Sequence, residues 1–217
     1  NTPEGKNLVG TFHQPARVLI DPETLASLPP REYREGFAEI IKHAAIRDAA
    51  MLPDIARVAA SGTQRAGLAA LIARNVAIKA AIVSADEFET KGLRALLNFG
   101  HTIGHAIEAS AGYGQLLHGE AISLGIRAAL QLSQQFGGQP EADAQALLAL
   151  PAAFHLPLPL PADITDAQIL EKMGRDKKFD QGAIRFVLLR KNGDSYVSSD
   201  VTREAILEAV QALRTAP

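Results

Sequence analysis

Apolar residues recur at the spacing of an α-helix along most of this chain. Between residues 31 and 50, Phe37, Ile41 and Ala44 fall on one helical face. A second such stretch, over residues 63–85, is dominated by Leu, Ile, Val and Ala. The same pattern predicts further helices from near Leu93 onward and over residues 118–136, 141–150, 165–174 and 201–213.

Two short parts of the chain have the pattern of β-structure instead. Residues 18–22 form a β-type run that Pro22 ends, and a lone strand is not stable in water. Residues 184–189 and 195–198 flank Asn192-Gly193, a strong hairpin signal. The predicted fold class is therefore mainly α: a multi-helix domain with a short N-terminal strand and a small C-terminal β-hairpin.

Composition narrows the classes of protein and of partner. The chain has 217 residues, of which 47% are hydrophobic and only 5% aromatic, which favours packed helices over a β-sandwich. A net charge of −2 without a long basic run argues against nucleic acid and membrane surfaces as partners. We find no signal peptide and no apolar run of the roughly 18 residues that a membrane span needs, so we expect a cytoplasmic protein.

The most informative stretch is LNFGHTIGHAIE at residues 97–108, followed by HGE at residues 118–120. His101 and His105 are four residues apart, which on a helix places both imidazoles on one face about 6 Å apart. His118 follows a glycine-containing turn that would fold the next helix back. Because the chain has no cysteine, a metal here would be held by nitrogen and oxygen. Spacing alone leaves two interpretations open: a zinc-like site, or hydrogen-bonded core histidines.

Three further groups of polar residues are candidates either for a cleft or for ordinary surface positions. Arg94, Asn98, His101 and His105 lie at i, i+4, i+7 and i+11, a polar stripe that we interpret as facing a cleft. Lys79 lies among small apolar residues, where it either reaches to water or points into a cleft. Three residues separate Glu39 from Lys42, which taken alone indicates an ordinary surface ion pair.

Four segments carry a resemblance to a known family: GKNLVGTFHQP, VLIDPETLASLPPREYREGFAEIIKHA, LRALLNFGHTIGHAIEASAGYGQLLHGEAISLGI, and MGRDKK followed by IRFVLL. The chain resembles the C-terminal part of the 3-dehydroquinate synthase family. The resemblance implies that residues 1–29 are a remnant of the interdomain region and residues 30–217 a helical metal- and substrate-binding domain. It also implies that the family's N-terminal NAD-binding domain is absent, so we expect the isolated chain to be inactive.

The resemblance also assigns a metal site and proton-transfer residues. Glu39, His101 and His118 match the family's zinc ligands, a set that leaves coordination positions open for substrate; cobalt is an alternative metal. His105, a ligand candidate by spacing, matches a residue that transfers protons at the substrate. Glu89 matches a proton acceptor, although one extra residue near Lys91 separates Lys79 from Arg94. The catalytic candidates are His105, Glu89 and Lys42.

The remaining matched positions divide between substrate and NAD. The substrate contacts implied by the family are Asn7, Lys42, Lys79, Arg94, Asn98, His105, Lys177 and Lys178. The implied NAD contacts are Lys6, Thr24, Leu25, Ala26 and Ser27. Lysine and arginine suit a phosphorylated sugar acid, because they form charge-assisted hydrogen bonds to phosphate and carboxylate.

The function implied is NAD- and zinc-dependent cyclisation of 3-deoxy-D-arabino-heptulosonate 7-phosphate to 3-dehydroquinate with loss of phosphate, in the shikimate pathway. The family also implies a homodimer for the full-length enzyme. Two alternatives share the superfold: another sugar phosphate cyclase, and a metal-dependent polyol dehydrogenase, which would not need the Lys79, Arg94 and Lys177 cluster. An alternative of a different class is a non-catalytic helical metal-binding or interaction module.

Overall fold

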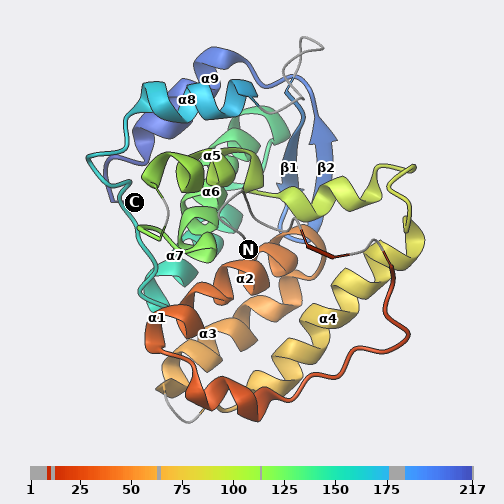
Figure 1. Ribbon diagram of the computed structural model, residues 1–217. Helices are drawn as coiled ribbons and strands as arrows, with labels where there is room; N and C mark the ends of the chain where they lie inside the picture. The colour runs from red at the N-terminus through yellow and green to blue at the C-terminus, as the bar shows by residue number, and fades with distance from the viewer. Residues whose placement is uncertain (1–8, 11–12, 63–64, 113, 176–183, 217) are drawn as a thin grey trace.

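The structure is a computed structural model that describes residues 9–10, 13–62, 65–112, 114–175 and 184–216 (Figure 1). Helices dominate it, which confirms the predicted fold class. In chain order the elements are η1 (Pro22–Ser27), α1 (Pro30–Glu35), α2 (Phe37–Arg47), η2 (Ala49–Met51), α3 (Leu52–Ser61), α4 (Leu68–Ala85), η4 (Leu93–Asn98), α5 (His101–Ala111), α6 (His118–Leu132), η5 (Ser133–Gly137), α7 (Glu141–Ala153), α8 (Asp166–Arg175), β1 (Phe186–Lys191), β2 (Asp194–Ser198) and α9 (Arg203–Ala212). The η elements are 3₁₀ helices, except that η5 is a π-helix.

Helix α6 lies at the centre of the fold, and nearly every residue from Gly119 to Leu132 is buried. On one side it adjoins a hydrophobic cluster built from α2, α3, α4 and α7. On the other side it adjoins a second cluster built from α5, α8, α9 and β1. A helix that is apolar nearly all round must be covered on all sides, and the two clusters provide that cover.

Helices α5 and α6 cross at backbone contact, because glycines meet at the crossing. A Cβ added at Gly125 of α6 would lie 2.0 Å from the carbonyl oxygen of Gly100, at the start of α5. A Cβ at Gly104 would lie 2.8 Å from a side-chain carbon of Ile122. At this crossing the start of α5 lies against Gly125 in the middle of α6, and the start of α6 lies beside Glu108 in the later part of α5, so the histidines of the two helices lie near one another.

Two predicted helices are divided by glycine. The helix expected over residues 31–50 is α1 and α2, with Gly36 between them, followed by the 3₁₀ turn η2. The central helix expected from Leu93 is also wrong in its first part. Residues 93–98 form the 3₁₀ helix η4, and Gly100, with φ of +76° in the left-handed region, separates it from α5. The stripe from Arg94 to His105 is therefore not continuous on one α-helix.

The two β predictions have opposite outcomes. The hairpin forms as predicted: β1 pairs antiparallel with β2, and Gly193 adopts a positive φ of 86° in the turn. The N-terminal strand does not form in this structure. Residues 18–20 have no regular structure, and Val18, Leu19 and Ile20 are all exposed.

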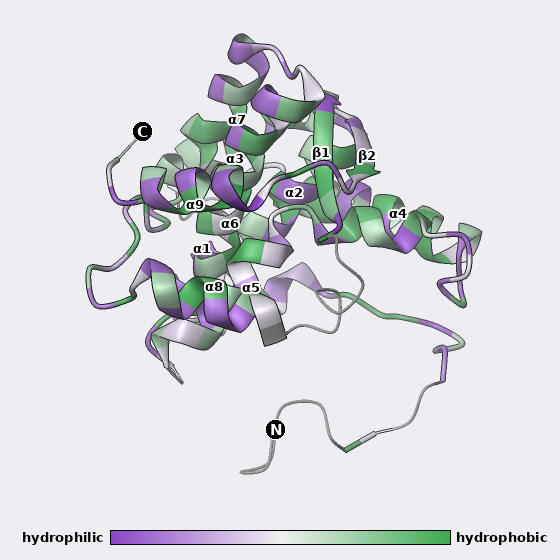
Figure 2. Ribbon diagram, turned by 90° about the horizontal axis from the view of Figure 1, so that it is seen from above, coloured by the Kyte–Doolittle hydropathy of each residue, from purple (hydrophilic) through white to green (hydrophobic). Residues whose placement is uncertain are grey.

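Most residues of helix α4 are apolar, as the green of its ribbon in Figure 2 shows. By length and composition alone it could cross a membrane, contrary to the expectation that no such run exists, although Arg74 and Lys79 interrupt it. It packs against α2, α3 and η4, yet only 17% of its residues are buried.

Candidate functional site

The three histidines of the central motif come together, His101 and His105 from α5 and His118 from the start of α6. Their ring centroids are 5.1 Å apart for His101 and His105, 5.6 Å for His101 and His118, and 5.6 Å for His105 and His118. One ring nitrogen from each lies within 4.8 Å of the others, which makes the three a candidate metal-binding group. His101 is buried, His118 is partly buried and His105 is exposed.

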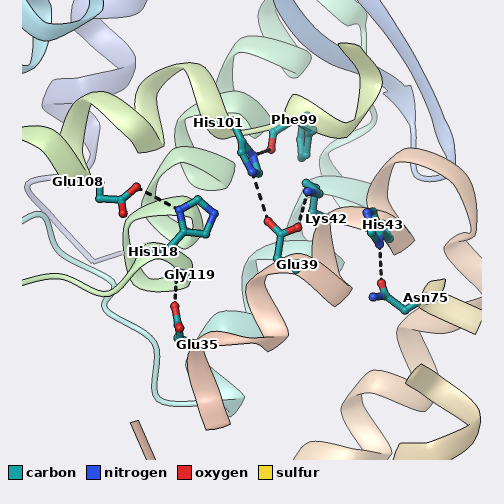
Figure 3. Close-up of polar contacts among 10 residues, drawn as sticks. All are labelled: Glu35, Glu39, Lys42, His43, Asn75, Phe99, His101, Glu108, His118 and Gly119. Atoms are coloured by element: carbon teal, nitrogen blue, oxygen red, sulfur yellow. Dashed lines mark hydrogen bonds and ion pairs between the residues drawn. The ribbon is translucent and has the colours of Figure 1, made fainter. Parts of the chain in front are cut away.

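Two of these imidazoles are oriented by an oxygen acceptor at Nδ1 (Figure 3). His101 Nδ1 lies 3.1 Å from the carbonyl oxygen of Phe99. His118 Nδ1 lies 3.0 Å from Oε2 of Glu108. An oxygen acceptor requires the proton on Nδ1, so in both neutral rings the lone pair belongs to Nε2. Metal-ligating histidines are usually oriented in this way.

Glu39 of α2 lies beside the second ring nitrogen of His101, Nε2. Its Oε1 lies 3.3 Å from His101 Nε2, and no hydrogen-bond partner for this buried oxygen is found in the part of the chain that the structure describes. Ligand atoms on one tetrahedral zinc are about 3.3 Å apart, given Zn–N and Zn–O distances of about 2.0–2.1 Å. Glu39 and His101 already have that spacing, and the donor set is one that zinc and cobalt accept. The residues present therefore fit the metal.

The structure thus brings together two overlapping ligand sets. Both contain His101 and His118. The third ligand is Glu39 in the set that the family resemblance implied, and His105 in the set that imidazole spacing gives. Glu39 Oε1 is 3.3 Å from His101 Nε2, the candidate ligand nitrogens of the three histidines lie within 4.8 Å of one another, and His105 is the exposed member of the cluster.

Lys42 is not part of an ordinary surface pair. Its ammonium donates to Glu39 Oε2 at 2.6 Å, and only 4% of its side chain is exposed. Burial lowers the pKa of Lys42, the Glu39 carboxylate opposes that effect, and the charge of Lys79 adds to it. Burial alone would raise the pKa of Glu39, but His101 when its ring is protonated, together with the ammonium of Lys42, holds that pKa well below its usual range. Glu39 is therefore a carboxylate at neutral pH.

A buried histidine that the sequence analysis missed lies next to Lys42. His43 Nδ1 is 2.6 Å from Oδ1 of Asn75 on α4 (Figure 3). Burial and the charges of Lys42 and Lys79 lower the pKa of His43 to about 4, so the ring is neutral at pH 7. Lys79 on α4 is exposed, and its charge contributes to the lowered pKa of both Lys42 and His43.

Arg94 and Glu89 are paired with each other in the loop before α5. Arg94 Nε lies 3.2 Å from Glu89 Oε1, and Arg94 Nη1 donates to the carbonyl oxygen of Glu87 at 3.0 Å. Asp86 accepts hydrogen bonds from the backbone N–H groups of Lys91, Leu93 and Arg94, which fixes the loop and lowers the pKa of Asp86. Asn98, at the end of η4, is exposed.

Four of the five implied NAD contacts, residues 24–27, lie in η1. Thr24, Ala26 and Ser27 are exposed there, and Leu25 is partly buried, with its carbonyl oxygen accepting from Arg65 at 3.0 Å. Four implied site residues lie outside the described part of the chain: Lys6, Asn7, Lys177 and Lys178.

Helix α1 anchors the first turn of α6, an interaction that no local signal could have revealed. Arg31 donates two hydrogen bonds to the carboxylate of Glu120, at 2.7 and 2.6 Å, although 89 residues separate them. Glu35 Oε2 accepts from the backbone N–H of Gly119 at 2.5 Å. A Cβ at Gly119 would lie 2.0 Å from the carbonyl oxygen of Glu35, so only glycine permits this approach. These contacts hold the backbone beside His118.

Comparison with known proteins gives the family of this chain. The family model described as 3-dehydroquinate synthase C-terminal matches residues 36–179, and the model described as 3-dehydroquinate synthase N-terminal matches residues 1–35. The chain belongs to the 3-dehydroquinate synthase family. The resemblance seen in the sequence is thereby confirmed.

Curated relatives named 3-dehydroquinate synthase support the assignment. The protein from Methylacidiphilum infernorum is 44% identical over 206 residues, which are 95% of this chain and 56% of the relative. The protein from Opitutus terrae is 46% identical over 210 residues, which are 96% of this chain and 58% of the relative. The chain thus spans less than two thirds of the length of these family members.

Solved structures of related enzymes share the fold. The 2-epi-5-epi-valiolone synthase from Streptomyces hygroscopicus, solved with NAD⁺ and Zn²⁺ bound, is 30% identical with a TM-score of 0.85 over 98% of this chain and 59% of that one. A 2-deoxy-scyllo-inosose synthase, solved with carbaglucose-6-phosphate, NAD⁺ and Co²⁺, is 27% identical with a TM-score of 0.80 over 98% of this chain and 60% of that one.

Proposed function

We propose that this chain provides the metal- and substrate-binding part of a 3-dehydroquinate synthase. The reaction is cyclisation of 3-deoxy-D-arabino-heptulosonate 7-phosphate to 3-dehydroquinate with loss of phosphate. Membership of the family and relatives at 41–46% identity that carry this name support the choice over another sugar phosphate cyclase. The observation that supports the proposal is the position of His101: it lies in a cluster with His105 and His118 and 3.3 Å from Glu39, which is paired with the buried Lys42.

In this proposal Glu39, His101 and His118 hold zinc or cobalt, which accept carboxylate oxygen and imidazole nitrogen as ligands. When bound, the metal supplies Lewis-acid stabilisation of a substrate hydroxyl that loses its proton, and NAD supplies the transient oxidation. The NAD contacts made by this chain are Lys6 and residues 24–27. Residues 1–29 then form the interdomain segment, and residues 30–217 the helical domain.

The cationic side chains bind the two anionic groups of the substrate. The charge of Lys79 acts on Lys42, and charge-assisted hydrogen bonds from these two lysines suit a phosphate or a carboxylate. Arg94, Asn98, Asn7 and the lysines at 177 and 178 complete the set. Lys42 is already desolvated, so binding an anion in place of part of its pair with Glu39 requires little further loss of water.

His105 transfers protons at the substrate, with Glu89 as a second acceptor. His105 lies on the exposed side of the histidine cluster, within reach of a group that approaches the metal. For Glu89 to act, it has to leave its ion pair with Arg94, and an incoming substrate anion that takes the guanidinium would release it.

Because the chain spans 56–58% of the curated relatives, we expect no turnover from these 217 residues by themselves. A full-length counterpart, which we propose to be a cytoplasmic homodimer, should release phosphate only with NAD and metal present. The assay measures phosphate release and product formation for this chain alone and for the full-length protein. If the full-length protein converts a different sugar phosphate and forms no 3-dehydroquinate, the proposed function is wrong and the protein is another sugar phosphate cyclase.

A further inference from the structure

Glu108 lies on the face of α5 that meets the start of α6, and none of the expected roles involves it. Its Oε2 is 3.0 Å from Nδ1 of His118, across the turn between the two helices. The Glu108 side chain is 26% exposed and that of His118 is 35% exposed, so the contact is partly shielded from water. Figure 3 shows the second ring nitrogen of His118 pointing away from Glu108, toward the side where His101 and Glu39 lie.

His101, the buried histidine of the cluster, shows the same arrangement with a different acceptor. His101 donates Nδ1–H to the carbonyl oxygen of Phe99 and presents Nε2 to Glu39. The acceptor for His101 is backbone, which the helix start fixes. The acceptor for His118 is a side chain, so the sequence at position 108 determines whether His118 has one.

We propose that Glu108 is a positioning residue for His118. By accepting the Nδ1 proton, the Glu108 carboxylate holds His118 in the tautomer whose Nε2 lone pair faces the cluster. Its negative charge also makes that nitrogen a stronger donor to a cation. The inference rests on the proposed metal site, and it adds to that site the group that prepares one ligand in the metal-free protein.

Zinc affinity tests the role directly. Competition against a chromophoric chelator gives the zinc Kd of the 217-residue chain and of its variants. Glu108→Gln keeps an acceptor but loses the charge, and Glu108→Ala loses both. We expect Kd to rise in both variants, with the larger rise, roughly 10- to 100-fold, in Glu108→Ala. Glu208→Gln, the same loss of charge at an exposed position of α9, is the matched control and should leave Kd unchanged.

The tautomer of His118 provides a readout that does not require a metal. Long-range ¹H–¹⁵N NMR spectra of the metal-free chain at pH 8, where ordinary imidazoles are neutral, distinguish Nδ1–H from Nε2–H. His118 should be the Nδ1–H tautomer in the parent chain and a mixture in Glu108→Ala. If the parent chain shows Nε2–H at His118, the proposal is wrong, whether or not any variant folds.

Different results would contradict the proposed metal site and the proposed role of Glu108. If His118→Ala leaves the zinc Kd unchanged, the metal site itself is wrong, and Glu108 has no ligand to position. If His118→Ala loses zinc while Glu108→Ala binds it as tightly as the parent chain, the metal site holds and the role of Glu108 is refuted.

Discussion

Lys42 is a buried lysine, and its ion pair with Glu39 stabilises its charge in that position. Removing an ammonium from water costs several kcal/mol unless it is paired and hydrogen-bonded, and here Glu39 supplies the pairing. The same carboxylate offers its second oxygen to His101. Glu39 therefore links the lysine expected to meet substrate with the histidine expected to hold the metal, and a change at Glu39 acts on both.

His101 and His105 lie on the same helix but should behave differently when replaced. His101→Ala removes a proposed ligand and should abolish stoichiometric zinc binding. His105→Ala should keep the zinc, because Glu39 completes the ligand set, and in a full-length enzyme it should lower the rate by about 10²–10⁴-fold, as is typical for loss of a general acid–base group. Zinc content by atomic absorption, beside single-turnover NAD reduction, measures both. Equal zinc loss in the two variants would make His105 a ligand instead.

His43 should make the protein less stable in acid. Its pKa is about 4 in the fold, below the ordinary value of 6.5, so between these pH values the unfolded chain binds the extra proton and the folded chain does not. The free energy of unfolding should fall by up to about 3 kcal/mol as the pH drops from 6.5 to 4, and change little from this residue outside that window.

Urea denaturation at a series of pH values measures the effect. His43→Gln, which can still donate to Asn75, should flatten the profile between pH 4 and 6.5. His155→Gln alters an exposed histidine and should leave the slope in place. A profile in which both variants keep the parent slope would contradict the buried neutral state of His43.

At the scale of elements, the crossing of α5 and α6 decides where the histidines meet. Gly125→Ala would place a methyl group 2.0 Å from the carbonyl oxygen of Gly100, so the helices must separate. We expect a loss of several kcal/mol of stability, as overpacked cores show, together with weaker zinc binding. Gly174→Ala on α8 is the control: nothing lies within 4 Å of the added Cβ, and it should stabilise the helix by up to about 1 kcal/mol. Chemical denaturation compares the two.

Elements whose signals are local were predicted, and those that depend on distant partners were not. The hairpin follows from Asn192-Gly193, because the turn residues alone fix its geometry. The break before α5 needs Gly100 in the left-handed region and Gly125 opposite it, and periodicity carries no information on either. The strand at residues 18–22 failed for the same reason, since a strand requires a pairing partner.

The candidate site divides in the same way. The spacing of His101, His105 and His118 was enough to predict that they meet, because one helix and one turn connect them. The contribution of Glu39 came from family resemblance and was visible in spacing only as an ion pair. His43–Asn75 and Arg31–Glu120 join residues 32 and 89 positions apart, and no pattern within a helix reveals such pairs.

At the scale of the whole molecule, zinc should stabilise the fold, because its proposed ligands come from three helices that separate on unfolding. At a free zinc concentration of 100 times Kd, the gain is about 2.7 kcal/mol. For a domain of this size that corresponds to a rise of about 5–11 °C in Tm. Differential scanning calorimetry with zinc and with a chelator measures the shift, and His101→Ala should show none. An equal rise in that variant would place the stabilising zinc elsewhere.

The burial of α6 has a consequence for the timing of amide exchange with solvent. Its backbone is enclosed by α2, α5, α7, α9 and β1, so no local fraying exposes its middle turns. Amides there exchange hydrogen only when the whole domain opens, and their protection reports the global free energy of unfolding. His118 is the first residue of that same helix. Zinc bound at this end raises the global free energy of unfolding and therefore slows amide exchange along the length of α6. Amides in the middle of the helix thus report the occupancy of a metal site with which they have no contact.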